Sequence, residues 1–244
     1  MQMLRSFSAR RRVLAVVVLC LAAVGLFQWR ADRSITPVFA RMTQQTLIID
    51  PGHGGEDGGA VSGNGQAESQ INLAIALELD QLMGFYGVPT VMTRNTDVSI
   101  HDADAKTLRE KKVSDLHNRV ALIERIPNAT LLSIHQNASP SSGHRGLQVF
   151  YANEALSLPL AQAMQKSLNE VLTPEKQRAP QKILSSVYLM NHISCRAVLV
   201  ECGFLSNPEE AALLQERVYQ MKLAMTMGAC YLTSGTLREG EACL

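Results

Sequence analysis

Residues 46–73 read TLIIDPGHGGEDGGAVSGNGQAESQINL, and the rest of the chain can be interpreted from this stretch. It opens with a short apolar run, Leu47–Ile49, which ends at a turn signal, Pro51-Gly52, and is therefore typical of a buried strand. The strand leads to His53 in a loop rich in glycine, the residue that loses the most backbone freedom on folding. Such a loop is favoured where the backbone must pass close to another group. Because Glu68 follows at the start of a helical pattern, the loop would bring a histidine and a carboxylate together in a metal or catalytic site.

Charge and cysteine content limit the classes of function. The 244 residues have a formal net charge of +1, and several arginines lie in the N-terminal segment, so the remainder is slightly acidic. A nucleic-acid-binding domain would show a basic patch or stripe, so we do not expect nucleic acid as a partner. No C-x-x-C pair occurs, which argues against a zinc–cysteine site. We expect mostly buried free thiols; Cys195–Cys202 and Cys230–Cys243 bridges remain open as alternatives outside the cytoplasm.

The N-terminal segment has the features of an export signal or a membrane anchor. Arg10–Arg12 precede an apolar run, Val13–Trp29, that is long for a secretory signal and barely long enough to span a bilayer. Arginines on the N-terminal side of the apolar run predict that the N-terminus stays in the cytoplasm and that the rest of the chain is exported. We therefore predict a cytoplasmic basic stub and an anchor helix in residues 1–30, followed by a polar linker over residues 31–45. The alternative is a signal that is cleaved near Ala40, which would release the protein.

Strand and helix patterns alternate over residues 46–235. Short apolar runs predict strands at Thr46–Asp50, Val88–Thr93, Thr130–Ile134, Leu147–Tyr151 and Ala197–Val200. Apolar residues at three- and four-residue steps predict helices at Ser69–Phe85, around Val113–Ile123 with Val113, Leu116, Val120 and Ile123 facing inward, at Leu156–Val171, after Asn207-Pro208, and at Glu216–Leu232. This alternation predicts a single three-layer α/β/α sandwich around a mostly parallel, mixed sheet of about six strands. Residues 236–244 would form a C-terminal tail.

Three of the predicted strands lead to a side chain that can take part in chemistry, namely His53, His135 and Glu201. In open α/β sheets, ligands bind outside the carboxyl ends of the strands. If these strands are parallel neighbours, the three side chains converge, and Glu68 can fold back to the same place. Two histidines and a glutamate with an open fourth position form a known catalytic zinc set. Glu201 would then be available as the general base.

The patterns DPGHGGEDGGA with E-x-x-x-N-L, SIHQNA and VECGFLSNPEE follow one another along the chain. In this order they resemble the zinc-dependent N-acetylmuramoyl-L-alanine amidases of the bacterial cell wall, over about Thr46–Thr233. The resemblance implies Zn²⁺ as cofactor, His53, Glu68 and His135 as its ligands, and Glu201 as the catalytic glutamate. It also implies hydrolysis of the amide bond between the lactyl group of N-acetylmuramic acid and L-alanine in peptidoglycan.

Within this family, the chain is most similar to the sporulation amidases that prepare muramic lactam formation in the spore cortex. The N-terminal anchor, the stretch LREKKVSDLHNRVALIE, the residues Tyr188–Asn191 and the lack of wall-binding modules carry this likeness. The implied partners are a peptidoglycan glycan strand with its stem peptide and, through the N-terminal segment, the membrane. An activating partner protein is a further option, because the chain shows no wall-targeting module. Gln136 departs from the family pattern, which often has an apolar residue there.

Local spacing leaves other interpretations open. His53 and Glu56 form an H-x-x-E pair of the kind found in zinc carboxypeptidases, so Glu56 competes with Glu68, and a metallopeptidase is the rival enzyme. The alternative from a different functional class is a wall-binding protein of the same fold that is inactive or depends on a partner. Asn137 is a candidate for substrate binding, with an ordinary loop asparagine as the alternative. A solvated polar loop explains His101, Asp102 and Asp104 better than a second metal cluster does.

Overall fold

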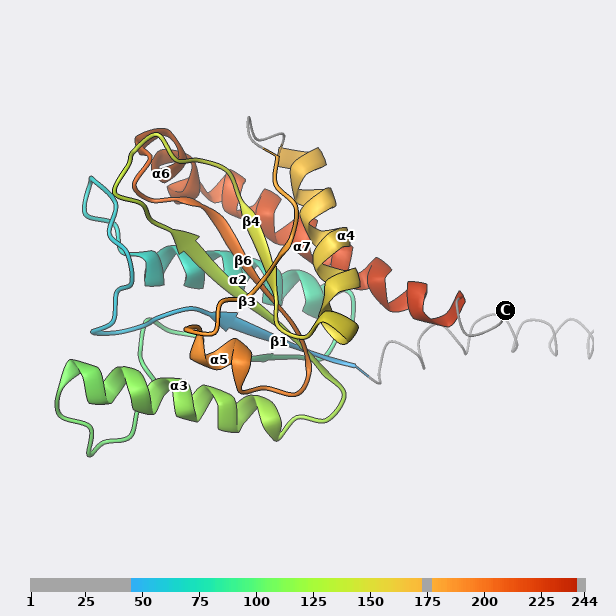
Figure 1. The fold of residues 1–244 in the computed structure, drawn as a ribbon, viewed down its shortest axis with the longest axis horizontal. Helices are drawn as coiled ribbons and strands as arrows, with labels where there is room; N and C mark the ends of the chain where they lie inside the picture. Colours follow the sequence, from blue (N-terminus) through green and yellow to red (C-terminus); the bar gives the residue numbers. More distant parts are fainter. Residues whose placement is uncertain (1–44, 173–176, 241–244) are drawn as a thin grey trace, which may run out of the picture. The chain divides into compact units, whose positions relative to one another are not determined.

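The computed structural model describes residues 45–172 and 177–240, which belong to one compact unit that begins at Gln45 (Figure 1). The predicted anchor, nearly all of the predicted linker and the last residues of the predicted tail lie outside the described residues. Among the described residues, no helix combines the length and apolar character needed to cross a membrane. Cys195, Cys202 and Cys230 are free thiols, so the Cys195–Cys202 bridge is not formed.

A six-stranded sheet forms the centre of this unit, in the order β2-β1-β3-β6-β4-β5. The strands are β1 (Thr46–Pro51), β2 (Thr90–Met92), β3 (Ala129–Asn137), β4 (Gln148–Tyr151), β5 (Gln181–Lys182) and β6 (Arg196–Phe204). Neighbouring strands run parallel except β4 and β6, which pair antiparallel. The predicted mostly parallel, mixed sheet is therefore confirmed. Because β1, β3 and β6 are adjacent and parallel, their carboxyl ends lie at one edge.

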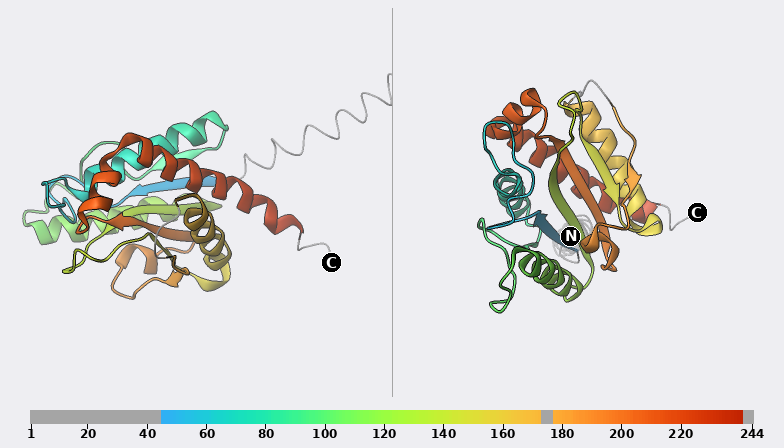
Figure 2. Two further views of the ribbon diagram at one scale, coloured as in Figure 1. Left: turned by 90° about the horizontal axis from the view of Figure 1, so that it is seen from above. Right: turned by 60° about the vertical axis from the view of Figure 1, so that its left-hand side comes forward.

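Helices cover both faces of the sheet. They are α2 (Glu68–Phe85), α3 (Leu108–Glu124), α4 (Glu154–Leu172), α5 (Tyr188–Asn191), α6 (Pro208–Gln215) and α7 (Arg217–Gly240). Figure 2 shows α2 and α7 on one side of the sheet and α3 and α5 on the other. α4 packs against α7 and against β4 and β6. The last helix continues to Gly240, so it passes the expected end at Leu232 and includes the first residues of the predicted tail.

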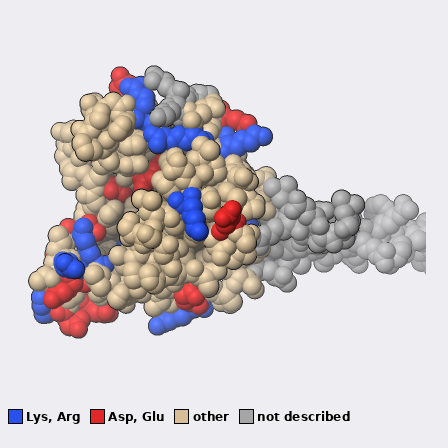
Figure 3. Space-filling view, in the orientation of Figure 1, with Lys and Arg blue, Asp and Glu red and all other residues tan. Residues whose placement is uncertain are grey.

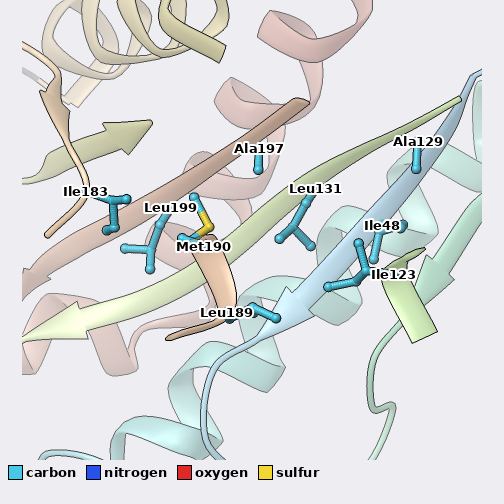
Figure 4. Close-up of a cluster of buried hydrophobic side chains, with 9 residues drawn as sticks. All are labelled: Ile48, Ile123, Ala129, Leu131, Ile183, Leu189, Met190, Ala197 and Leu199. Carbon is cyan, nitrogen blue, oxygen red and sulfur yellow. The ribbon is translucent and has the colours of Figure 1, made fainter. Parts of the chain in front are cut away.

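The central strands are apolar without alternation because helices cover both of their faces. The side chains of Leu47, Ile48 and Ile49 are fully buried. On the α3 and α5 side, residues from β1, β3 and β6 pack against those two helices in one cluster (Figure 4). The cluster consists of Ile48, Ile123, Ala129, Leu131, Ile183, Leu189, Met190, Ala197 and Leu199. The three strands that bear the candidate site residues are therefore anchored in the core. His53 follows β1, His135 lies in β3, and Glu201 lies in β6.

The predicted inner face of α3 is partly wrong. Ile123 is buried, and Leu116 and Val120 pack partly buried against the core cluster, but 46% of Val113 is exposed. The most buried polar residues of this helix are Asp115 and Arg119 instead. Hydrophobic periodicity cannot identify this face because Arg119 is buried through ion pairs rather than through apolar packing. Its partners are Asp50, which is distant in sequence, and Asp115, one turn away in the same helix.

The predicted start of the helix after β6 is confirmed. Asn207 caps α6, and its side-chain oxygen accepts hydrogen bonds from the backbone N–H groups of Glu209 and Glu210. Pro208 takes the first helical position, where no N–H is needed. The capped helix α6 thus begins shortly after β6, the strand that carries Glu201.

The surface mixes charges of both signs. On the face shown in Figure 3, basic and acidic side chains are interspersed among a larger area without charge. This arrangement agrees with the formal net charge of +1 for the whole chain. Such a face has no continuous basic stripe that would attract a polyanion over a long distance.

Candidate metal centre

The carboxyl ends of β1, β3 and β6 bring together the residues that the sequence predicts for the site. His135 on β3 lies directly opposite Glu201 on β6. His53 follows β1, and Glu68 is the first residue of α2. The candidate ligand atoms of His53, Glu68 and His135 all lie within 4.8 Å of one another. The convergence that three separate strand ends predicted is thus present in the fold.

Glycine in the loop after β1 is needed for close approach. At Gly59, where φ is +70°, a Cβ atom would lie 2.5 Å from Oε2 of Glu68 and 2.7 Å from Cδ2 of His53. A Cβ atom on Gly52 would overlap the ring of His135. The loop therefore packs directly against all three candidate ligands, as its glycine content predicted, and a larger side chain at either position would displace one of them.

Glu68 is held as a buried carboxylate. It is 3% exposed, and its Oε2 accepts from the backbone N–H of Ala60 at 2.9 Å while Oε1 accepts from that of Gln136 at 3.0 Å. Nδ1 of His135 lies 3.0 Å from Oε1, and Nε2 of His53 lies 3.3 Å from Oε2. Burial alone would raise the pKa of Glu68, but the hydrogen bonds and charge of the two histidines outweigh it and hold the pKa well below its usual range. Glu68 is thus ionised at neutral pH.

His53 is oriented from its other nitrogen by Asp57. Nδ1 of His53 lies 3.1 Å from Oδ2 of Asp57, and the other oxygen of this carboxylate, Oδ1, forms an ion pair with Nζ of Lys112 at 2.8 Å. Burial would lower the pKa of His53, but the hydrogen bonds and charges of Asp57 and Glu68 raise it to about 9. In metal sites, the ring nitrogen that does not bind the ion commonly donates to a carboxylate. The contacts of His53 fit this pattern. A role for Asp57 was not predicted from the sequence. The available signal was an acidic residue four positions after the histidine in the same glycine-rich loop.

Glu201 has a buried oxygen atom without a partner. Its Oε2 has no hydrogen bond to the described residues. Burial raises the pKa of Glu201, the charges of His135 and His53 oppose the rise and that of Glu68 adds to it, so that the pKa lies at about 7. Unsatisfied buried carboxylate oxygens are rare in proteins and call for a functional explanation. Beside two histidines and an ionised glutamate, this group can accept a proton near neutral pH.

Comparison with known proteins agrees with this geometry. A family described as N-acetylmuramoyl-L-alanine amidase matches residues 47–229. The chain belongs to this amidase family. It is 34% identical over 202 residues to the germination-specific N-acetylmuramoyl-L-alanine amidase of Bacillus subtilis, covering 82% of this chain and 84% of that protein.

Solved structures support the same assignment. The CwlD amidase from Clostridioides difficile, solved in complex with the GerS lipoprotein, is 34% identical. It covers 77% of this chain and 96% of its own, with a TM-score of 0.73. The catalytic domain of CwlV from Bacillus (Paenibacillus) polymyxa is 26% identical, covers 78% of this chain and 97% of its own, and has a TM-score of 0.67. The chain is therefore an N-acetylmuramoyl-L-alanine amidase that acts on peptidoglycan.

The sequence also offered Glu56 and Asn137 as candidate residues of the amidase. Glu56, the rival ligand, is exposed and pairs with Lys111 rather than with the two histidines. Asn137 ends β3, is half-buried, and its backbone carbonyl accepts from the N–H of Leu205 at 2.8 Å. A substrate-binding role of its side chain stays a prediction.

The polar loop of the amidase between β2 and α3 does not form a metal cluster with a histidine and two acids. Asp102 instead accepts hydrogen bonds from Ser114 at 2.8 Å and Asn118 at 3.0 Å. In residues 45–172 and 177–240, the group of His53, Glu68 and His135 is the one set of three side chains close enough to share an ion. The solvated-loop interpretation of His101, Asp102 and Asp104 fits these contacts.

A buried ionic network beneath the loop of the amidase escaped the sequence interpretation. Asp50 is 1% exposed and accepts from Arg119 at 2.6 Å, Ser133 at 2.7 Å and Thr93 at 2.7 Å. Burial alone would raise the pKa of Asp50, but Arg119 and the two hydroxyl groups lower it to about 2. The available signal was an acidic residue inside an otherwise apolar strand, which requires a partner when it is buried.

Proposed function

We propose that this amidase depends on zinc, with His53, Glu68 and His135 as the metal ligands and Glu201 as the general base. The observation that carries the proposal is the cluster of three candidate ligand atoms within 4.8 Å of one another. The orphaned oxygen of Glu201 beside it supports the same role. Two histidines and one glutamate with an open position are a known catalytic zinc set, so this donor chemistry fits the ion.

Bound zinc would polarise the amide carbonyl and lower the pKa of a water molecule from about 16 to about 7. Glu201, whose pKa is raised by burial, accepts the proton that the attacking water loses. It then donates this proton to the nitrogen of the leaving L-alanine, so the amine departs neutral. Asp57 keeps Nδ1 of His53 engaged, which leaves Nε2 toward Glu68.

For the substrate, we propose the amide bond that joins the lactyl group of N-acetylmuramic acid to L-alanine of the stem peptide. We further propose a role in spore cortex maturation, through the stem-peptide removal that muramic lactam formation needs. The likeness to a germination-specific amidase of Bacillus subtilis supports this role. The likeness to an amidase solved with the GerS lipoprotein supports activation or assembly with a partner protein.

The proposed organisation follows the sequence. Residues 1–30 would anchor the protein, 31–45 would link the anchor to the enzyme, 46–235 would be the catalytic domain, and 236–244 would be the tail. The arginines before the apolar run support an exported catalytic domain at the outer face of the cytoplasmic membrane, or a secreted one if cleavage occurs near Ala40.

The test is digestion of purified peptidoglycan by the zinc-loaded full chain in detergent, with Glu201→Gln beside it. Mass spectrometry should detect free stem peptides that begin with L-alanine, and Glu201→Gln should release about 10²- to 10⁴-fold less of them. Loss of only a C-terminal residue from the stem would instead indicate a carboxypeptidase. Intact lactyl–alanine bonds in the presence of zinc, and also after addition of cell extract, would refute the proposed activity. If the chain is active only after cell extract is added, the enzyme depends on a partner.

A further inference from the structure

Two arginine side chains are buried beneath the loop that carries His53. Arg94 is 3% exposed and Arg119 is 2% exposed. Arginine is almost never fully buried unless its charge is paired or its donors are satisfied. A second cation nearby increases the free-energy cost of burying a guanidinium group. Burial together with the charge of Arg119 lowers the pKa of Arg94 to about 10. The position of two such groups at one site therefore needs an explanation.

Arg94 connects the backbone next to one candidate ligand with the backbone next to another. Its Nε donates to the carbonyl of Pro51 at 3.0 Å, and its Nη2 donates to that of Gly52 at 3.0 Å. The same Nη2 also donates to the carbonyl of Ser69 at 2.8 Å. Gly52 precedes His53 in the chain, and Ser69 follows Glu68. One guanidinium nitrogen thus bridges the segments that bear these two ligands.

Arg119 holds the next part of the same loop. Its Nη2 donates to the carbonyl of His53 itself at 2.7 Å, and its Nη1 donates to the carbonyl of Pro51 at 2.9 Å. Its charge is balanced by Asp50 at 2.6 Å and Asp115 at 2.7 Å. Three consecutive carbonyl groups, those of residues 51, 52 and 53, therefore accept hydrogen bonds from the two guanidinium groups.

These hydrogen bonds act where the backbone is in a sparsely populated conformation. His53 has a φ of +62°, which residues other than glycine rarely adopt. Such a conformation persists only when the surrounding structure holds it in place. The guanidinium group suits this task because its planar fork presents several donors in fixed directions, whereas a lysine offers a single point charge.

We propose that Arg94 and Arg119 are positioning residues of the metal centre, which hold the backbone of residues 51–53 and tie it to the first turn of α2. They keep His53 and Glu68 at a separation suited to a shared metal ion. The inference rests on the proposed zinc site. A purely structural role, in which the arginines only join α3 and β2 to the core, predicts lower stability with unchanged zinc affinity in the folded protein.

The test compares Arg94→Lys with Arg196→Lys in the full chain. Arg196 is a matched control because it is 7% exposed and donates to Thr130 at 3.0 Å, at the opposite end of the parallel strands. Zinc affinity is measured by competition with a chromogenic chelator, and folding is checked by circular dichroism. Arg94→Lys should bind zinc about 10- to 100-fold more weakly, the range seen when groups that orient metal ligands are removed. Arg196→Lys should bind zinc as the unmodified chain does.

A second readout separates positioning from loss of structure. If zinc binding alone is weakened, excess zinc should restore most of the peptidoglycan turnover of Arg94→Lys. Zinc affinity of folded Arg94→Lys within twofold of the unmodified chain, or an equal loss in Arg196→Lys, would overturn the inference. If the unmodified chain does not bind zinc, the proposed function fails first, and the comparison shows this directly.

A second variant covers the case in which Arg94→Lys does not fold. Arg119→Gln combined with Asp50→Asn removes both charges of the buried pair together and leaves polar groups at both positions. This double variant loses the charge-assisted hydrogen bond to the carbonyl of His53. It should show the same weakening of zinc binding by about 10- to 100-fold. Unchanged affinity in the folded double variant would also overturn the inference.

Discussion

The contact of Gly59 with two candidate ligands can be tested with substitutions at two glycines that have nearly the same φ. Gly59 has a φ of +70°, and an added Cβ atom would lie 2.5 Å from Oε2 of Glu68 and 2.7 Å from Cδ2 of His53. Gly87, in the turn after α2, has a φ of +69° and no atom within 4 Å of an added Cβ. Gly87→Ala therefore introduces the backbone strain alone, and Gly59→Ala adds the collision with the two candidate ligands.

The expected magnitudes follow from these geometries. The left-handed conformation costs an alanine about 1–2 kcal/mol relative to glycine, so Gly87→Ala should lower the free energy of unfolding by about this amount. Insertion of a group into packed surroundings costs about 1–3 kcal/mol more, which Gly59→Ala should show in addition. Glu68 cannot simply move aside, because Oε2 also accepts from the backbone N–H of Ala60 at 2.9 Å. Gly59→Ala should therefore also weaken zinc binding, about 10-fold or more.

The assay is urea unfolding of both variants together with zinc titration against a chelator. The unfolding midpoint gives the stability change as long as the slope with urea stays the same. Equal loss of stability in the two variants, with equal zinc affinity, would refute the claim that the loop packs against the ligands. A loss of zinc affinity in Gly87→Ala would show that backbone strain at a distance is sufficient, and would refute it as well.

Three further predictions concern carboxylates. Glu201→Gln should reduce peptidoglycan turnover by about 10²- to 10⁴-fold with zinc still bound, measured by product release and metal content. Glu68→Ala should abolish zinc binding, whereas Glu56→Ala should leave zinc affinity and turnover unchanged, because Glu56 is exposed and pairs with Lys111. The third concerns Asp50, whose pKa is lowered from 3.8 to about 2. Its contribution to stability, about 2 kcal/mol, is complete above its unfolded pKa and is lost as the pH falls through its folded pKa, so urea midpoints of the unmodified chain should fall more steeply between pH 5 and pH 2.5 than those of Asp50→Asn.

Each of these predictions has a contradicting result. Zinc lost together with turnover in Glu201→Gln would make Glu201 a ligand or a structural residue rather than the base. Retained zinc in Glu68→Ala, with loss in Glu56→Ala, would restore the metallopeptidase interpretation. Parallel pH dependence of the unmodified chain and Asp50→Asn would show that the ion pair with Arg119 does not set the ionisation of Asp50.

Much of the fold was accessible from local patterns. The run Leu47–Ile49 is fully buried in β1, as an unbroken apolar stretch of strand length predicts. Asn207 caps α6 because its short side chain reaches the free N–H groups of the first turn, which is a local interaction. The short strand β5, Gln181–Lys182, has no apolar signal, because both residues are exposed at the edge of the sheet. No local pattern predicts it.

Three of the candidate site residues could be proposed because each follows a recognisable local signal, but the groups that support the site could not. His53, His135 and Glu201 stand at or just after the ends of apolar runs, and parallel neighbouring strands bring such positions to one edge. Arg94 and Arg119 lie in stretches that read as ordinary polar loop and helix surface. Their burial depends on acceptors that only the assembled fold brings near. Arg94 donates to the carbonyl of Gly52, 42 residues away in the chain, and Arg119 donates to the carboxylate of Asp50, 69 residues away.

The sequence by itself determined the α/β alternation, the family and the identity of the residues that meet at the strand ends, because hydrophobic period, glycine content and short motifs are local properties of the chain. Only the tertiary structure decided that Glu68 rather than Glu56 lies beside the two histidines. It also decided that α3 turns Arg119 inward and that Gly59 must stay a glycine. These outcomes depend on contacts between segments far apart in the chain, where burial, ion pairing and steric overlap are set by packing rather than by the neighbours of a residue in sequence.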